Sequence, residues 1–185
     1  NLAFNHRSKD QRLSLFLQAN YGIEKRNLFD NTSFVSQALN LPPNAPEIYD
    51  EEGNLNWENS TWNNPLATLY RTNDARTNSL LTNFGFSYLI VKGLTLKANF
   101  GYSTLNAEEV TKNPVRSYDP EIQCRIVPTS RHQLTNRDSW VTEPQLHYEF
   151  SLEKHNFNII TGLTFQERTD KVVSMRGEGF SNENL

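Results

Sequence analysis

The feature that most constrains the fold is a two-residue alternation between apolar and polar side chains. In residues 94–103 the apolar positions are Leu94, Leu96, Ala98, Phe100 and Tyr102, and every residue between them is polar or small. Successive side chains of a β-strand point to opposite faces, so this segment predicts a strand with one apolar and one polar face. A helix is a poor alternative, because residues two positions apart do not share a helical face.

The same alternation recurs along the chain and groups into three hairpins. It is found in the segments 2–4, 13–21, 79–90, 139–152 and 157–165. The short connections at 6–11, 91–93 and 153–156 predict turns, and Gly93 can adopt the positive φ that tight turns often need. Pro144 cannot donate a ladder hydrogen bond, so we expect a bulge or a locally unpaired site there. The sequence therefore predicts an all-β fold with about six antiparallel strands.

Short turns alternate with two long connections, at about 22–76 and 105–137. In an up-and-down sheet every second connection lies at the same end, so all the short turns share one end and all the long loops the other. This asymmetry is typical of outer-membrane β-barrels, which have short periplasmic turns and long extracellular loops. A soluble sandwich has Greek-key crossings instead. We therefore expect up-and-down strands from the wall of a large transmembrane β-barrel.

Aromatic residues near the strand ends agree with this placement. Tyr21, Tyr102 and Trp140 would fall near the outer membrane interface, a depth at which amphipathic rings are enriched. A second set lies within a few residues of the short turns: Tyr88, Tyr148 and Phe157. Cross-strand aromatic pairs in a soluble sheet would be an alternative explanation for any one of these residues.

Composition excludes several other classes of protein. The formal net charge is −3 and the 18 Lys and Arg residues are scattered, so no basic patch suggests a nucleic-acid partner. No stretch approaches the roughly 18 consecutive apolar residues of a membrane helix. The single cysteine, Cys124, excludes a disulfide framework and has no companions for a zinc site. No signal peptide is visible before Asn1, so we expect a processed chain or an internal fragment.

Polar residues on the alternating strands are the candidates for a lumen-facing surface: Asn83, Asn99, Glu143, His147 and Glu149. A histidine beside two carboxylates invites a metal or acid–base hypothesis. A polar lumen needs such residues in any case, and no phosphate loop, nucleophile elbow or zinc-ligand spacing occurs. We therefore predict no enzyme activity, no metal site and no cofactor.

The first long connection contains a predicted small hairpin with its turn at Asp50 to Gly53. The acidic residues of this turn do not match the spacing of an EF-hand calcium loop. Tyr49, Trp57 and Trp62 are candidates for contact with a ligand or partner, because exposed aromatic rings stack on sugars and anchor proteins. Alternatively, these rings form the core of the loop itself.

Several motifs resemble the SusC/RagA family of TonB-dependent outer-membrane transporters. They are the proline-rich segment 39–46, the turn from Tyr49 to Trp57, Asn64-Pro65-Leu66-Ala67 and the hairpin strand 92–102. The resemblance implies a 22-stranded barrel with an N-terminal plug, in the outer membrane of a Gram-negative bacterium. It also implies energy input through TonB, a SusD-like lipoprotein as a lid, and import of oligosaccharides or peptides. Residues 1–185 would then be part of the barrel wall, in contact with outer-membrane lipid and without the plug, the TonB box or a signal peptide.

Two other functions remain open from the sequence. A soluble all-β module could bind carbohydrate through Tyr49, Trp57 and Trp62, and a β-sheet hydrolase could use Glu143 and Glu149. Sugar and peptide substrates are not distinguished, because lumen-facing Asn, Ser, Gln and Glu side chains suit both.

Overall fold

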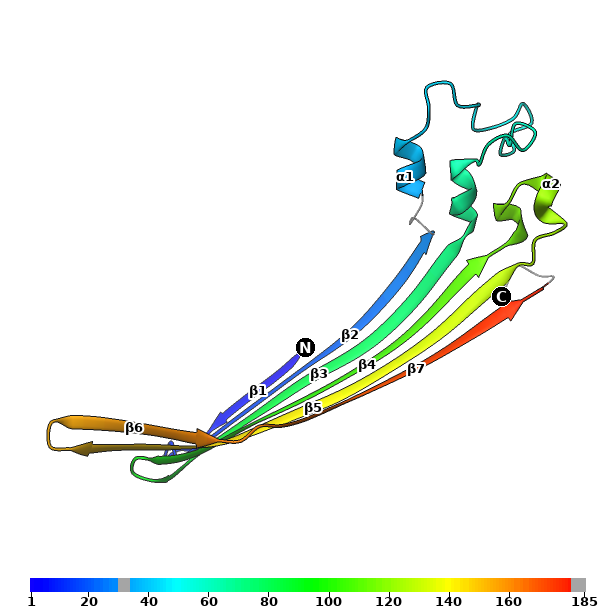
Figure 1. Ribbon diagram of the computed structural model, residues 1–185. Coiled ribbons are helices and arrows are strands. Elements are labelled where there is room, and N and C mark those ends of the chain that lie inside the picture. The colour runs from blue at the N-terminus through cyan, green and yellow to red at the C-terminus, as the bar shows by residue number, and fades with distance from the viewer. Residues whose placement is uncertain (30–33, 181–185) are drawn as a thin grey trace. The chain divides into compact units, whose positions relative to one another are not determined.

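The computed structural model describes residues 1–29 and 34–180, and these form one antiparallel β-sheet with seven strand segments (Figure 1). The strands are β1 (Leu2–Arg7), β2 (Leu13–Phe29), β3 (Thr72–Val91), β4 (Leu94–Asn113), β5 (Thr129–Leu152), β6 (His155–Gly162) and β7 (Phe165–Glu178). From β1 to β6 the order of the strands in the sheet follows their order in the sequence. The predicted all-β, up-and-down fold is thereby confirmed.

The strands β6 and β7, orange and red in Figure 1, both pair with β5. They are separated by Leu163 and Thr164 alone. This interruption lies beside Pro144 of β5, whose carbonyl accepts a hydrogen bond from the Leu163 amide at 3.0 Å. Because proline has no N–H, Pro144 cannot return a second bond to its neighbour. The irregularity expected at Pro144 is therefore present, and it appears in the strand opposite the proline.

The strands continue further than the alternation predicts, so the predicted long loops at 22–76 and 105–137 were too long. β2 continues to Phe29 and β3 begins at Thr72, while β4 continues to Asn113 and β5 begins at Thr129. The added strand ends carry polar residues on both faces, as in Thr72-Asn73-Asp74. A strand with two polar faces leaves no two-residue hydropathy signal, which is why the sequence missed these ends. Residues 30–33 of the first loop lie outside the described residues.

The chain divides into two compact units, and each is described by itself. The first unit comprises 1–23, 77–106 and 135–172, and the second comprises 24–76, 107–134 and 173–185. In the first unit β1 pairs with β2 from Leu2↔Ala19 to Arg7↔Ser14. The β5–β6 pairing runs from Gln145↔Gly162 to Leu152↔His155.

Tight turns join the two strands of each of these hairpins in the first unit. Lys92 and Gly93 alone connect β3 to β4, and Gly93 has a φ of +87°, which confirms the predicted positive φ. A Cβ at this glycine would lie 2.3 Å from the Glu149 carbonyl oxygen, so a side chain is excluded by space as well as by conformation. Glu153 and Lys154 alone connect β5 to β6.

The second unit holds four short helices in its loops. They are α1 (Phe34–Leu39), η1 (Pro65–Tyr70), η2 (Val115–Ser117) and α2 (Pro120–Gln123). Within the described ranges Ala67, with 4% exposure, is the one buried hydrophobic side chain. Close packing is therefore found in the loops around η1, and the faces of the sheet are open. No helix in the described part of the chain combines the length and the apolar character needed to cross a membrane.

Candidate functional site

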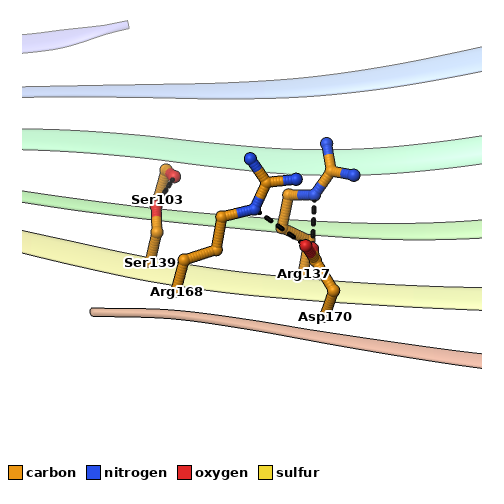
Figure 2. Close-up of polar contacts among 5 residues, drawn as sticks. All are labelled: Ser103, Arg137, Ser139, Arg168 and Asp170. Atoms are coloured by element: carbon orange, nitrogen blue, oxygen red, sulfur yellow. Dashed lines mark hydrogen bonds and ion pairs between the residues drawn. The ribbon is translucent and has the colours of Figure 1, made fainter.

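The polar face of the first unit is built from the predicted polar positions of β3, β4 and β5. A Cβ added to Gly101 would meet the side chains of Val141 and Asn83, and one added to Gly85 would meet those of Phe16 and Asn99, so this face also carries two apolar side chains. These contacts place Asn83 and Asn99 on one face, as the alternation predicts. Ser103 and Ser139 join it from β4 and β5, with their hydroxyl oxygens 2.8 Å apart (Figure 2).

Charged residues extend this polar face across β5 and β7. Asp170 accepts hydrogen bonds from two guanidinium groups: Nε of Arg137 lies 2.6 Å from Oδ1, and Nε of Arg168 lies 2.8 Å from Oδ2. In Figure 2 the terminal nitrogens of both arginines point away from Asp170. The three side chains are between 40% and 56% exposed. The cluster therefore combines two cations with one anion on an open surface.

The other predicted lumen-facing residues lie along β5. Glu143, His147 and Glu149 occupy the same alternate positions of β5 as Ser139. His147 contacts a neutral partner, with Nε2 3.1 Å from Oε1 of Gln145. Across the described residues no group of three His, Cys, Asp or Glu side chains is placed to hold a metal ion.

The opposite, apolar face of the first unit is exposed. Phe4, Leu152 and Ile159 are each more than half exposed. Near the β5–β6 turn, Phe150 stacks on Tyr148 and Phe157 with ring centroids 5.1 and 5.0 Å away. Exposed apolar side chains that cluster on one face are unfavourable in water, and such faces are often interaction surfaces.

Two of the predicted rim aromatics carry their polar atoms to charged neighbours. Trp140 donates its indole N–H to Glu167 at 3.2 Å, and the Tyr102 hydroxyl lies 3.4 Å from Oδ1 of Asp138. Tyr21 is 61% exposed. A ring with a polar group at one end suits a boundary between an apolar and an aqueous medium.

In the second unit the predicted small hairpin is present. Tyr49 and Leu55 form a β-bridge, and the Asp50 carboxylate accepts the backbone N–H groups of Glu52 and Asn54 at 3.0 and 2.7 Å. Gly53 takes a φ of +85°. Asp50 therefore stabilises its own turn, which is a sufficient structural role for this acidic residue.

Asn64 holds this hairpin against η1. Its side-chain amide donates to the carbonyls of Ile48 and Asn56 at 2.7 and 3.0 Å, and its Oδ1 accepts the Leu66 N–H at 3.0 Å. Asn64 is 2% exposed. From the sequence Asn64 is only part of a motif, because its bonds to Ile48 and Asn56 depend on how the loop folds back.

The three aromatic candidates have different surroundings. Trp62 donates its indole N–H to the Asn56 carbonyl at 3.1 Å, so its polar atom is used inside the loop. Tyr49 is 55% exposed. Trp57 borders an open hollow of about 630 Å3, together with Tyr70 and Arg116. The Arg116 guanidinium lies 5.0 Å from the centre of the Tyr70 ring, a cation–π geometry.

Arg137, Arg168 and Asp170 are not evident as a site from the sequence. The alternation assigns each to a face, but it does not give the pairing of β5 with β7 that brings them together. The spacing of Arg168 and Asp170 weakly indicates that these two residues pair, because side chains at i and i+2 of a strand share a face.

The chain is similar in structure to solved importers. Three structures superpose with a TM-score of 0.75 at 20% sequence identity, over 99% of this chain: the RagAB peptide importer in the "closed-closed" state, the same importer in the "open-open" state, and the RagAB peptide transporter. The chain spans 21% of the length of each matched chain. No protein-family model and no curated protein matches the sequence. At this identity the likeness establishes a shared all-β fold.

Proposed function

We propose that this chain is part of the barrel wall of an outer-membrane nutrient importer of the SusC/RagA, TonB-dependent type. The observation that carries the proposal is the pair of unlike faces on one open sheet. The apolar face has no layer of the described chain over it, and the polar face carries amides, hydroxyls and charges. A membrane-spanning barrel requires both faces on every strand, apolar toward lipid and polar toward the lumen.

The similarity to the RagAB structures supports the same proposal. Those proteins are named as peptide importers, and the chain superposes on part of one of their subunits. By this analogy, peptides are the favoured substrate class, with oligosaccharides the other possibility. Energy input through TonB and a SusD-like lipoprotein partner belong to the same proposal.

Within this proposal the residues have distinct roles. The candidates Asn83, Asn99, Glu143, His147 and Glu149 would face the lumen. Tyr49 and Trp57 would contact substrate or the lipoprotein from the extracellular loops. For Trp62 the internal hydrogen bond favours a supporting role in the loop over direct contact.

Two neighbouring positions on β3 test the lipid-facing assignment. In the intact protein, expressed in the outer membrane of a Gram-negative host, Phe84→Arg is expected to reduce the yield of folded barrel. Arg on the lipid face near the bilayer midplane costs about 2 to 4 kcal/mol. Asn83→Arg is the matched control, because it places the same side chain on the polar face, where water solvates it.

Folded barrel is quantified by the heat-dependent shift of its band on a denaturing gel. A loss of folded protein in Phe84→Arg together with normal yield in Asn83→Arg supports the proposal. Equal yields of the two variants would contradict the assignment of the faces. Normal secretion of both as water-soluble protein would instead favour a soluble all-β module.

A further inference from the structure

We propose that Arg137 and Arg168 form a binding site for a carboxylate group of a solute that reaches the polar face. Both guanidinium groups contact Asp170 through Nε alone, at 2.6 and 2.8 Å. A guanidinium and a carboxylate usually interact most strongly through two parallel N–H···O bonds. Here each arginine gives Asp170 a single bond, and its terminal nitrogens remain available.

The terminal nitrogens of both arginines point toward the open surface of the sheet (Figure 2). In Figure 2 they point away from Asp170 on both arginines, over the neighbouring strands. Within the described ranges they have no protein hydrogen-bond partner, and the Arg137 and Arg168 side chains are 44% and 56% exposed. Asp170 therefore holds two donor groups in place without using up their hydrogen-bonding capacity.

The charge of the cluster favours an anion. Two guanidinium groups and one carboxylate leave one net positive charge, and guanidinium groups stay protonated at all ordinary pH values. The neighbouring acids Asp138 and Glu167 form hydrogen bonds to Tyr102 and Trp140 on the opposite face. Among the described residues neither acid forms an ion pair with Arg137 or Arg168, whose paired acid is Asp170.

There is also space for a ligand. Arg168 borders a hollow of about 610 Å3 on the sheet. Its lining includes the polar residues Asn83, Ser103 and Ser139, the acidic residue Glu167, and the apolar residues Leu81 and Val141. A Cβ atom on Gly101 would lie 2.9 Å from the Val141 side chain, so the absence of a side chain at Gly101 leaves this part of the hollow open. Hydroxyl and amide groups beside a guanidinium pair can bind the polar atoms next to a carboxylate in a peptide or a sugar.

The two guanidinium groups determine the chemical class of the ligand. Paired planar guanidinium groups match the geometry of a carboxylate, which occurs in acidic peptides and in acidic sugars. The inference rests on the proposed function, because a lumen-facing surface exposes the cluster to imported solutes. It adds to that function a preference for acidic over neutral substrates.

The test measures binding of defined probes to the intact protein, purified in detergent, by isothermal titration calorimetry at low and at high salt. The probes are triglutamate, the neutral peptide Gln-Gln-Gln-amide and trigalacturonate. The Arg137→Gln/Arg168→Gln variant removes both guanidinium groups. Arg176→Gln is the matched control, because Arg176 lies on β7 and bonds Glu178 through Nε at 2.7 Å without a second arginine.

We expect the unmodified protein to bind at least one acidic probe and to bind Gln-Gln-Gln-amide at least tenfold more weakly. The double variant should lose at least tenfold in affinity for the acidic probe, whereas Arg176→Gln should not change it. Binding of both acidic probes indicates that a carboxylate group is sufficient for recognition by the two arginines. Binding of triglutamate alone indicates an acidic peptide as the ligand, and binding of trigalacturonate alone indicates an acidic sugar. The site is contradicted if neither acidic probe binds, or if the double variant binds as tightly as the unmodified protein.

Asp170→Asn gives an independent test in the opposite direction. If the arginines bind a carboxylate, removal of the competing charge of Asp170 should tighten binding of the acidic probe several-fold. The amide oxygen introduced by Asp170→Asn can still accept a hydrogen bond from an arginine Nε, so weaker or unchanged binding would contradict the site. The gel shift of each sample reports barrel folding, so a folded, unmodified protein that binds neither acidic probe overturns this site and leaves the proposed function standing.

Discussion

Leu163 donates its backbone N–H to the carbonyl of Pro144 at 3.0 Å, and Pro144 cannot return the bond. At a hydrogen-bonded position of an antiparallel ladder, the two opposed residues normally exchange both bonds. The missing donor coincides with the gap between β6 and β7 at Leu163 and Thr164. One proline therefore divides what would otherwise be a single strand beside β5.

A backbone N–H at position 144 should join β6 and β7 into one continuous strand. Pro144→Val supplies a backbone N–H opposite the Leu163 carbonyl, and the added bond is expected to stabilise the protein by about 0.5 to 1.5 kcal/mol. Hydrogen exchange at the Leu163 amide should become slower. Thr142→Val is the control, since it changes a side chain of β5 without adding a donor. Unchanged exchange at Leu163 in Pro144→Val would contradict this explanation of the gap.

The β3–β4 turn should tolerate no side chain at its second residue. In Gly93→Ala the methyl group would meet the Glu149 carbonyl oxygen, and alanine is disfavoured at a φ of +87°. We expect a loss of at least about 1 to 3 kcal/mol in the free energy of unfolding, measured by urea titration in lipid or detergent. Lys92→Ala, at the first turn residue, should cost far less. Similar stabilities for the two variants would contradict the turn geometry.

The loops of the second unit should depend on Asn64. Asn64→Ala removes the side chain that bonds the Ile48 and Asn56 carbonyls and the Leu66 N–H. Both carbonyls keep one other donor, so each lost hydrogen bond costs about 0.5 to 1.5 kcal/mol. We expect limited proteolysis to cut residues 47–63 much faster in this variant. Asn63→Ala changes the exposed neighbouring asparagine and should leave the cleavage rate unchanged, and equal rates would contradict the role of Asn64.

The stability of the β1–β2 turn should decrease in acid because Asp10 becomes protonated. Its pKa is lowered by a hydrogen bond from the Ser8 side chain and then by one from the Arg12 backbone N–H. A lowered pKa means that the carboxylate favours the folded turn above the ordinary Asp range and loses this effect as the pH falls through the lower, folded-state pKa. Hydrogen exchange at Arg12, corrected for its intrinsic pH dependence, should therefore lose protection in acid. In Asp10→Asn this pH dependence should be absent; an unchanged profile would contradict the assignment.

The sequence predicted the strands wherever one face is apolar. It placed Gly93 in a turn and the strand irregularity at Pro144, because both follow from the chemistry of a single residue. It missed the strand ends at 24–29 and 72–76, which contain the stretches 24–27 and 72–74 that are polar on both faces and interrupt the hydropathy pattern. The cluster of Arg137, Arg168 and Asp170 was also missed, because it depends on the pairing of β5 with β7. Alternation within one strand specifies a face, and it does not specify cross-strand neighbours.

The proposed function requires the two faces of this sheet to meet two different media. Nitroxide labels at single cysteines along β4 of the intact protein, in the Cys124→Ser background and in lipid vesicles, measure which medium each face meets. Labels at Leu96 and Phe100 should collide preferentially with lipid-soluble oxygen, and labels at Lys97 and Asn99 with a water-soluble nickel chelate. We expect accessibilities that alternate with a period of two residues. Equal access of the nickel chelate to all four positions would contradict it.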